Sequence, residues 1–380
     1  MLTAVERVVT RWMGRRSPWT NAYGLARSLL ALGTALTLVF NDSTVMFHPL
    51  AGMGTPPKCE SLAAGTLFCR LPHSLELARW VAIAILLIVA SGWRPRVTGV
   101  LHWWVAWSLA VSGSVVDGGD QIAAVIALVM IPMTITDPRR WHWDAPTVAS
   151  TEAMPRARLV AFSSAIALRV QVAGIYFHAA VAKFAVPEWA DGTAVYYSAI
   201  DPVIGQGPWI APLFSIPVVV VAATWGTLAF ETLLFTGLVM DTRWRRPLLV
   251  AAFAFHATIV VLHGLFSFFF TMASGLLLFL HPVDSPWPRI DRAWRRMRAV
   301  AGTRLTPALG RRIAVALFGL STSGCYVGLP ADEHPRCGRI TELASRAVAD
   351  GASPGLVLAV RSPQGHCDIA VGREGPTGPT

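Results

Sequence analysis

The chain has 380 residues, of which 54% are hydrophobic and only 14% are charged, and its mean hydropathy is +0.51. Soluble domains carry about 25% charged residues, so this composition excludes an ordinary soluble enzyme and indicates a membrane protein. The net charge of +10 does not indicate a nucleic-acid partner, because the arginines lie between apolar runs instead of gathering on one face. The 15 tryptophans fit helix ends that are anchored at a membrane surface.

Apolar segments recur along the chain, each with the length that crosses a hydrocarbon core of about 30 Å. They predict an all-α fold, a polytopic transmembrane helical bundle of about eight spans within residues 22–285. The first apolar run is not followed by a small-residue cleavage site, which favours a retained span over a removable signal peptide. The expected spans lie at residues 22–40, 75–92, 98–116, 121–136, 158–183, 214–240, 246–262 and 264–281.

The loops between these runs are alternately rich and poor in arginine. Loops rich in arginine stay on the cytoplasmic side of a membrane. The alternation therefore predicts a multi-pass plasma-membrane protein, surrounded by lipid, with a cytoplasmic N-terminus. The basic segments are 1–21, 94–96, 139–158, 243–246 and 286–312.

This orientation places the loop 41–74 outside the cell, and the loop contains Cys59 and Cys69. The outer face is oxidising, and the short segment between the two cysteines can close without strain, so the sequence predicts a disulfide. The alternative is two unrelated thiols.

The fifth expected span holds most of the polar residues inside the membrane: Arg169, Gln171, His178 and Lys183. An ionisable side chain at mid-membrane costs roughly 2.5–3.5 kcal/mol on insertion, so each is a functional candidate. At 100° per residue Gln171 and His178 share a helix face, with Lys183 further round, so they can line one cavity wall. We take Lys183 and His178 as the candidate catalytic residues.

Lys183 and Lys58 are the only lysines among 32 basic residues. A desolvated lysine can lose its proton and act as a base, whereas arginine cannot. The alternative is an anchor that extends to the membrane surface beside Glu188 and Asp191.

Four further ionisable residues fall within other expected spans or at their ends. Two histidines at seven-residue spacing and a glutamate are ligand types for a divalent ion. No HExxH or CxxC spacing accompanies them, and intramembrane histidines commonly form interhelical hydrogen bonds, so we predict no metal site. The four are His102, Glu231, His256 and His263.

An acidic turn, Asp117-Gly-Gly-Asp120, precedes the fourth span on the expected outer side. It is suited to a cation or a basic peptide, or else it is a hydrated connection. The segment Trp141-His142-Trp143 beside Arg139 and Arg140 is typical of an interfacial belt on the inner side.

Several motifs occur in an order that resembles the SdpB family of bacterial membrane proteins: "SGWRPRVTGVLHWWVAWSL", "DGGDQIAAVIALVMIP", "TDPRRWHW" and "IYFHAAVAKFAVPEWADGTAVYY". The resemblance covers about residues 20–290. It implies membership of the HTTM superfamily and a role in maturing or secreting an antimicrobial, sporulation-delaying peptide. It also implies an SdpA-like protein and an SdpC-like toxin precursor as partners.

The HTTM superfamily includes the membrane domain of vitamin K-dependent γ-glutamyl carboxylase. There a similar segment carries a catalytic lysine that acts on a quinol, and the matching position here is Lys183. The chain has Ala182 where that enzyme has a second lysine, and it lacks the large domain that would hold a glutamate substrate. The alternatives to peptide maturation are a quinone-dependent, carboxylase-like enzyme with Lys183 as base, and a peptide exporter. The chain has no GxxxxGK[ST] nucleotide-binding loop, so export would need an ion gradient or a partner.

The C-terminal region differs in character from residue 286 onward. Residues 313–325 form a short apolar stretch before Cys325, which is typical of a lipoprotein signal, or a ninth span if it inserts. Residues 326–380 suggest a helix and two strands, a small incomplete α/β tail that resembles the start of a secreted serine hydrolase. Such enzymes need a Ser-x-x-Lys motif, and the tail has no lysine, so we predict no hydrolase activity.

Overall fold

The computed structural model describes residues 16–49, 56–114, 116–145, 155–201 and 211–304, and in the tail residues 342, 345, 346, 349, 355–362 and 365–372. The stretch 313–325, with the ninth span expected there, lies outside the described residues. The chain divides into two compact units. One comprises Met1–His48 and Pro56–Met297, and the other Pro49–Thr55 and Arg298–Thr380.

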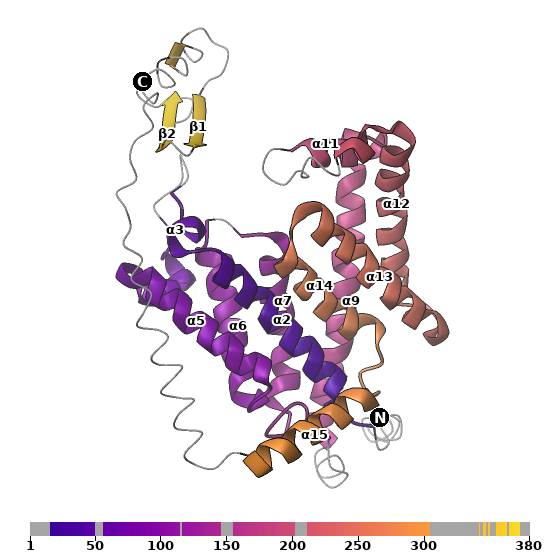
Figure 1. The fold of residues 1–380 in the computed structure, drawn as a ribbon. Coiled ribbons are helices and arrows are strands. Elements are labelled where there is room, and N and C mark those ends of the chain that lie inside the picture. The colour runs from indigo at the N-terminus through magenta and orange to yellow at the C-terminus, as the bar shows by residue number, and fades with distance from the viewer. Residues whose placement is uncertain are drawn as a thin grey trace, which may run out of the picture. The chain divides into compact units, whose positions relative to one another are not determined.

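The first unit is a bundle of helices, and each expected apolar segment forms one (Figure 1). The prediction of an all-α polytopic bundle is therefore confirmed. The eight apolar helices among the described residues that correspond to the expected spans are α2 (Asn21–Phe40), α5 (Leu75–Ser91), α6 (Pro95–Ser112), α7 (Gly118–Ile135), α9 (Pro155–Phe184), α12 (Pro217–Thr236), α13 (Thr242–His263) and α14 (Phe266–Leu280).

Short elements connect these helices, and a basic helix follows them. The connecting elements are α3 (Ser43–Met46), η1 (Ser61–Gly65), α4 (Leu67–Arg70), η2 (Pro72–Ser74), α10 (Pro187–Ala190), α11 (Ala194–Ile200) and η3 (Ala211–Ser215). The basic helix is α15 (Pro288–Arg304).

In the described part of the chain, six helical segments are long and apolar enough to cross a membrane: α2, η2 with α5, α7, α9, α12 and α13. Helix α14 has 15 residues, which is about 22 Å at a rise of 1.5 Å per residue. It is shorter than the hydrocarbon core, yet every residue from Thr271 to Leu280 is buried. A helix that is apolar all round and buried all round is expected at the centre of a bundle.

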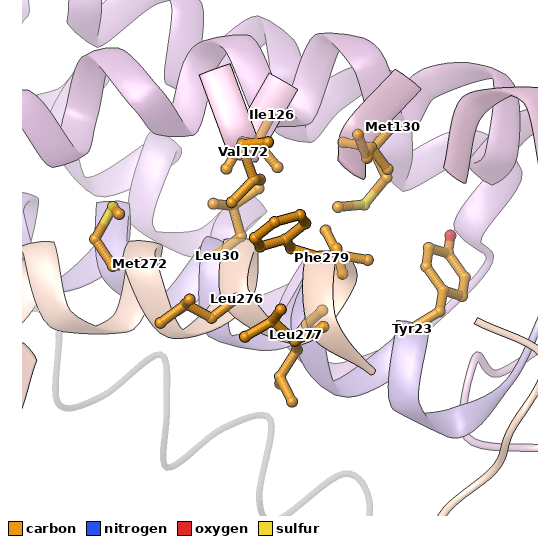
Figure 2. Close-up of a cluster of buried hydrophobic side chains, with 14 of the residues drawn as sticks. Tyr23, Leu30, Ile126, Met130, Val172, Met272, Leu276, Leu277 and Phe279 are labelled. Carbon is orange, nitrogen blue, oxygen red and sulfur yellow. The ribbon is translucent and has the colours of Figure 1, made fainter. Parts of the chain in front are cut away.

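The main hydrophobic core surrounds α14, with α2, α7 and α9 packed against it (Figure 1). Phe279 is fully buried and lies among side chains from these neighbouring helices, including Leu30 and Val172 (Figure 2). A second core joins α2, α5 and α6 around Phe68, Leu86 and Leu109. Helix α2 contributes to both cores and so connects the two halves of the bundle.

Cys59 and Cys69 form a disulfide, with their Cα atoms 5.4 Å apart, which confirms the predicted pairing. Nearby, Thr66 caps α4, and Leu67 N donates to Ser108 Oγ on α6 at 2.9 Å. The loop that carries the disulfide is therefore fixed to the bundle at α6.

The second unit contains two strands, β1 (Gly355–Ser362) and β2 (Gly365–Gly372). They pair antiparallel, with Gly355 opposite Gly372 and Ser362 opposite Gly365. This register makes them a hairpin.

Candidate functional site

The last turn of α9 carries Lys183, whose ammonium group lies between the two carboxylate oxygens of Glu231 on α12. Lys183 Nζ is 2.8 Å from both Oε1 and Oε2. The Lys183 side chain is 24% exposed and that of Glu231 is 9% exposed. A carboxylate that is almost completely buried needs a charged partner, and Lys183 supplies it.

The sequence positions the pair by spacing and by helix termination. Tyr176, Ala180 and Lys183 lie at positions i, i+4 and i+7 and form one stripe of α9. The helix ends soon after, because Val186 precedes Pro187 and takes an extended conformation. The chain then turns into α10, where the ring of Trp189 lies 5.3 Å from Lys183 Nζ. The ammonium group is thus held by a carboxylate and an aromatic face.

A second polar pair lies at the other end of the same stripe. The Tyr176 hydroxyl is 2.8 Å from Nε2 of His256 on α13, and both side chains are buried. His256 Nδ1 has no hydrogen-bond partner among the described residues. Tyr176 and Lys183 lie on the same stripe of α9, so the two pairs join this helix to α13 and α12. We call the four side chains the Lys183–Glu231 cluster.

The other predicted residues of this region differ in their burial. His178 is exposed on α9, while Arg169, Gln171 and His263 are half-buried. His178 therefore does not lie on the stripe that carries Lys183. His102 is buried on α6, and its Nε2 has no hydrogen-bond partner in the described part of the chain.

Sequence reasoning did not identify Tyr176 as a member of the cluster, or Trp189 as the ring beside Lys183. Tyrosine occurs only five times in the chain, and Tyr176 lies seven residues before Lys183. That spacing was the available signal, because residues seven apart share a helix face.

A different polar cluster occupies the opposite half of the bundle, around Arg27 of α2. Arg27 and His142 are both fully buried. Arg27 Nη1 lies 3.2 Å from His142 Nδ1 and donates to Val89 O at 3.3 Å. Its Nη2 donates to Thr98 Oγ1. The Asp137–Arg139 pair lies a few residues before His142. We call this group and that pair together the Arg27–His142 cluster.

Asp137 and Arg139 form a bidentate ion pair in the loop after α7, with bonds of 2.9 and 2.7 Å. The Asp137 side chain is fully buried, and that of Arg139 is 4% exposed. Arg139 Nη1 also donates to the carbonyls of His142 at 2.7 Å and Asp144 at 2.9 Å. The loop is thereby folded so that His142 points into the bundle.

His142 was expected in an interfacial belt, and the structure instead buries it. Burial and the positive charges of Arg27 and Arg139 hold the pKa of His142 well below its usual range, so the ring is neutral. Gly92, with φ at +89°, makes room for it, because a Cβ there would lie 2.4 Å from His142 Cδ2. The belt pattern could not indicate this, because amphipathic rings beside arginines are also typical of a surface.

The acidic turn lies at the start of α7. Asp117 caps the helix by accepting from Asp120 N at 2.8 Å. Asp120 is buried and accepts from Thr37 Oγ1 on α2 at 3.0 Å. Among the described residues no group of three or more His, Cys, Asp or Glu side chains is arranged to hold a metal ion.

Comparisons with known proteins agree with this architecture. The HTTM domain family matches residues 123–283, a range that contains the whole Lys183–Glu231 cluster. The chain is 43% identical over 293 residues to the uncharacterized protein YitO of Bacillus subtilis (strain 168), covering 75% of this chain and 93% of that protein. It is 36% identical over 275 residues to the sporulation-delaying protein SdpB of the same organism, covering 70% of this chain and 83% of SdpB. No solved structure matches. The chain therefore belongs to the SdpB-like family of HTTM membrane proteins.

Proposed function

We propose that this protein helps to mature or secrete an antimicrobial peptide of the sporulation-delaying type, and that the Lys183–Glu231 cluster is the place where it acts. The relation to SdpB supports the first part, because 83% of SdpB aligns with this chain. The partly exposed ion pair inside the matched HTTM region supports the second part. An SdpA-like protein and an SdpC-like precursor are the proposed partners.

The pair has the chemistry of a proton-exchange site. A proton that moves from the Lys183 ammonium to the Glu231 carboxylate turns an ion pair into a neutral amine and a carboxylic acid. A low-dielectric setting reduces the cost of that transfer, because it removes two buried charges. The neutral amine is then a general base for a substrate that reaches the exposed side of Lys183.

The same observation favours a second candidate, a quinone-dependent enzyme in which Lys183 takes a proton from a quinol. The two candidates share the amine and differ in the molecule that delivers the proton. A quinol analogue that inhibits formation of mature peptide would support the second candidate, and insensitivity to such analogues would leave the peptide itself as the proton donor.

The test replaces Lys183 in cells that coexpress the chain with its SdpA-like partner and the precursor. Lys183→Arg keeps the charge and the partner of Glu231 but cannot supply a neutral amine. For Lys183→Arg we expect a normal protein level and at least tenfold less mature peptide in the culture medium. Lys183→Ala is expected to lose the peptide as well, with a lower protein level because Glu231 is left unpaired. Lys58→Arg, at the other lysine, is the matched control and keeps peptide output. Normal output from Lys183→Arg would leave Lys183 as an anchor only.

The N-terminus is proposed to be cytoplasmic, on the alternation of arginine-rich loops. Topology reporters fused after residues 55, 117 and 200 are expected to be active outside, and those after 95, 145 and 243 inside. One inverted position in this series would refute the orientation or the span count.

A further inference from the structure

A cavity of about 490 Å³ lies beside the acidic turn, between the C-terminal part of α2, the start of α7 and the turn from α13 to α14. Pockets that hold small organic ligands span about 300–1,000 Å³. Most of the lining is apolar, with Leu36, Phe40 and Leu265 among its residues. The polar part is formed by Thr37, Asn41, Asp117, Asp120 and Ser267. The cavity thus combines an apolar wall with an acidic end.

Asp120 is the unusual member of the acidic end. It is only 3% exposed. Its Oδ1 accepts from Thr37 Oγ1, whereas its Oδ2 has no hydrogen-bond partner in the described ranges. Buried carboxylate oxygens are normally paired, because an unpaired one loses hydration without compensation. Asp120 therefore lines the cavity with a buried carboxylate oxygen that no described group satisfies.

Asp117 adds a second negative charge to the same end. Its Oδ1 caps α7, and its Oδ2 accepts a long hydrogen bond of 3.4 Å from Ser267 Oγ. The ion pairs found among the described residues involve neither aspartate. Two carboxylates in a mostly apolar setting without a cationic partner favour binding of a cation from outside the chain.

We propose that this cavity binds a primary ammonium group carried on an apolar body. An ammonium group has three donors and no acceptor, which matches the unpaired Oδ2 of Asp120 and the remaining capacity of Asp117. The apolar lining accommodates the chain or ring that carries the amine. A hard divalent cation such as Ca²⁺ needs about 6–8 oxygen ligands, more than this mainly apolar cavity offers.

The probe is dansylcadaverine, an aromatic ring joined by a pentyl chain to a primary amine, and its N-acetyl derivative is the neutral control. The full-length protein in phosphatidylcholine nanodiscs is titrated with each probe, and dansyl fluorescence reports binding. We expect saturable binding of the amine and at least tenfold weaker binding of the acetyl derivative. Equal affinity for the two probes would overturn the proposal.

Asp120→Asn is expected to weaken amine binding at least tenfold, whereas Asp191→Asn, the same change at an exposed aspartate, leaves it unchanged. Unchanged binding to folded Asp120→Asn would refute the site. If that variant does not fold, the site is tested by cross-linking the probe to the wild-type protein. Carbodiimide couples a bound amine to the carboxylate beside it. Mass spectrometry is expected to find the probe on Asp120 or Asp117 in clear excess over Asp191, and equal labelling of all three would refute the site.

Two sources can supply such an amine in a cell, a lipid headgroup and a basic peptide. Nanodiscs that contain phosphatidylethanolamine separate them. Weaker binding of the dye in these discs would show that the lipid amine occupies the cavity, and unchanged binding would assign it to a soluble amine. The assay contains no toxin precursor, so its result is independent of the role proposed for Lys183.

Discussion

The Arg27–His142 cluster and the Lys183–Glu231 cluster both place charged groups inside the bundle, but they are built differently. The first is enclosed, with Arg27 and His142 fully buried and with carbonyl, hydroxyl and carboxylate partners around its cations. The second is open on one side, because 24% of the Lys183 side chain is exposed. A cluster that is closed and has several partners around each cation holds helices together. A cluster that is open and held by one carboxylate can exchange a proton with a bound molecule.

The comparison predicts the largest loss of stability at the buried ion pair. Asp137→Asn leaves the Arg139 guanidinium buried without its countercharge, and breaking such a pair costs about 3–5 kcal/mol. We expect a large fall in folded yield and in the melting temperature of the protein in detergent. Asp241→Asn is the control, because Asp241 lies 3.7 Å from Arg243 in an exposed pair that contributes about 0–1 kcal/mol. Equal loss in the two variants would contradict the structural role of the Arg27–His142 cluster.

Gly92→Ala tests the close approach that admits His142. Alanine at φ +89° is strained, and its Cβ would lie 2.4 Å from the His142 ring. Overpacking costs about 1–3 kcal/mol, and the backbone strain adds roughly 1 kcal/mol. Gly174→Ala is the matched control, since nothing lies within 4 Å of the added Cβ. A thermal melt in which both variants match the wild type would refute the packing around His142.

Acid is expected to weaken the enclosed cluster. The pKa of His142 is held below its ordinary value by burial and by Arg27 and Arg139. Below about pH 6.5 the unfolded chain binds a proton that the folded chain does not, so His142 removes up to about 1.4 kcal/mol of stability per pH unit as the pH falls. The stability of His142→Asn is expected to depend less steeply on pH than that of the wild type. Parallel curves for the two proteins would contradict a neutral, buried His142.

The helices of this protein could be predicted from sequence, whereas the partners of their polar residues could not. The eight apolar runs became helices because lipid requires internally satisfied backbone, and hydropathy reports that requirement directly. Hydropathy does not indicate which face of α9 points into the bundle, since a helix that contacts both lipid and protein is apolar all round. The prediction from sequence therefore placed Lys183 and His178 in one site. In the structure Lys183 pairs with Glu231, and His178 is exposed.

The disulfide and the burial of His142 show the same distinction. Cys59 and Cys69 are close in sequence and on one loop, so a local argument was sufficient. The burial of His142 involves its contact with Arg27, which is 115 residues away in the chain. Contacts of that kind follow from the packing of α2 against the rest of the bundle, which no local pattern encodes.

The proposed function requires an amine at position 183, and an ion pair that joins α9 to α12 is not sufficient for it. The double variant Lys183→Glu with Glu231→Lys keeps the pair and reverses it. We expect this protein to reach normal folded levels and to yield no mature peptide, although each single variant lowers the protein level by leaving one charge unpaired. Restored peptide output from the reversed pair would contradict a role of the Lys183 amine in the reaction, because it would show that the Lys183–Glu231 pair only holds two helices together.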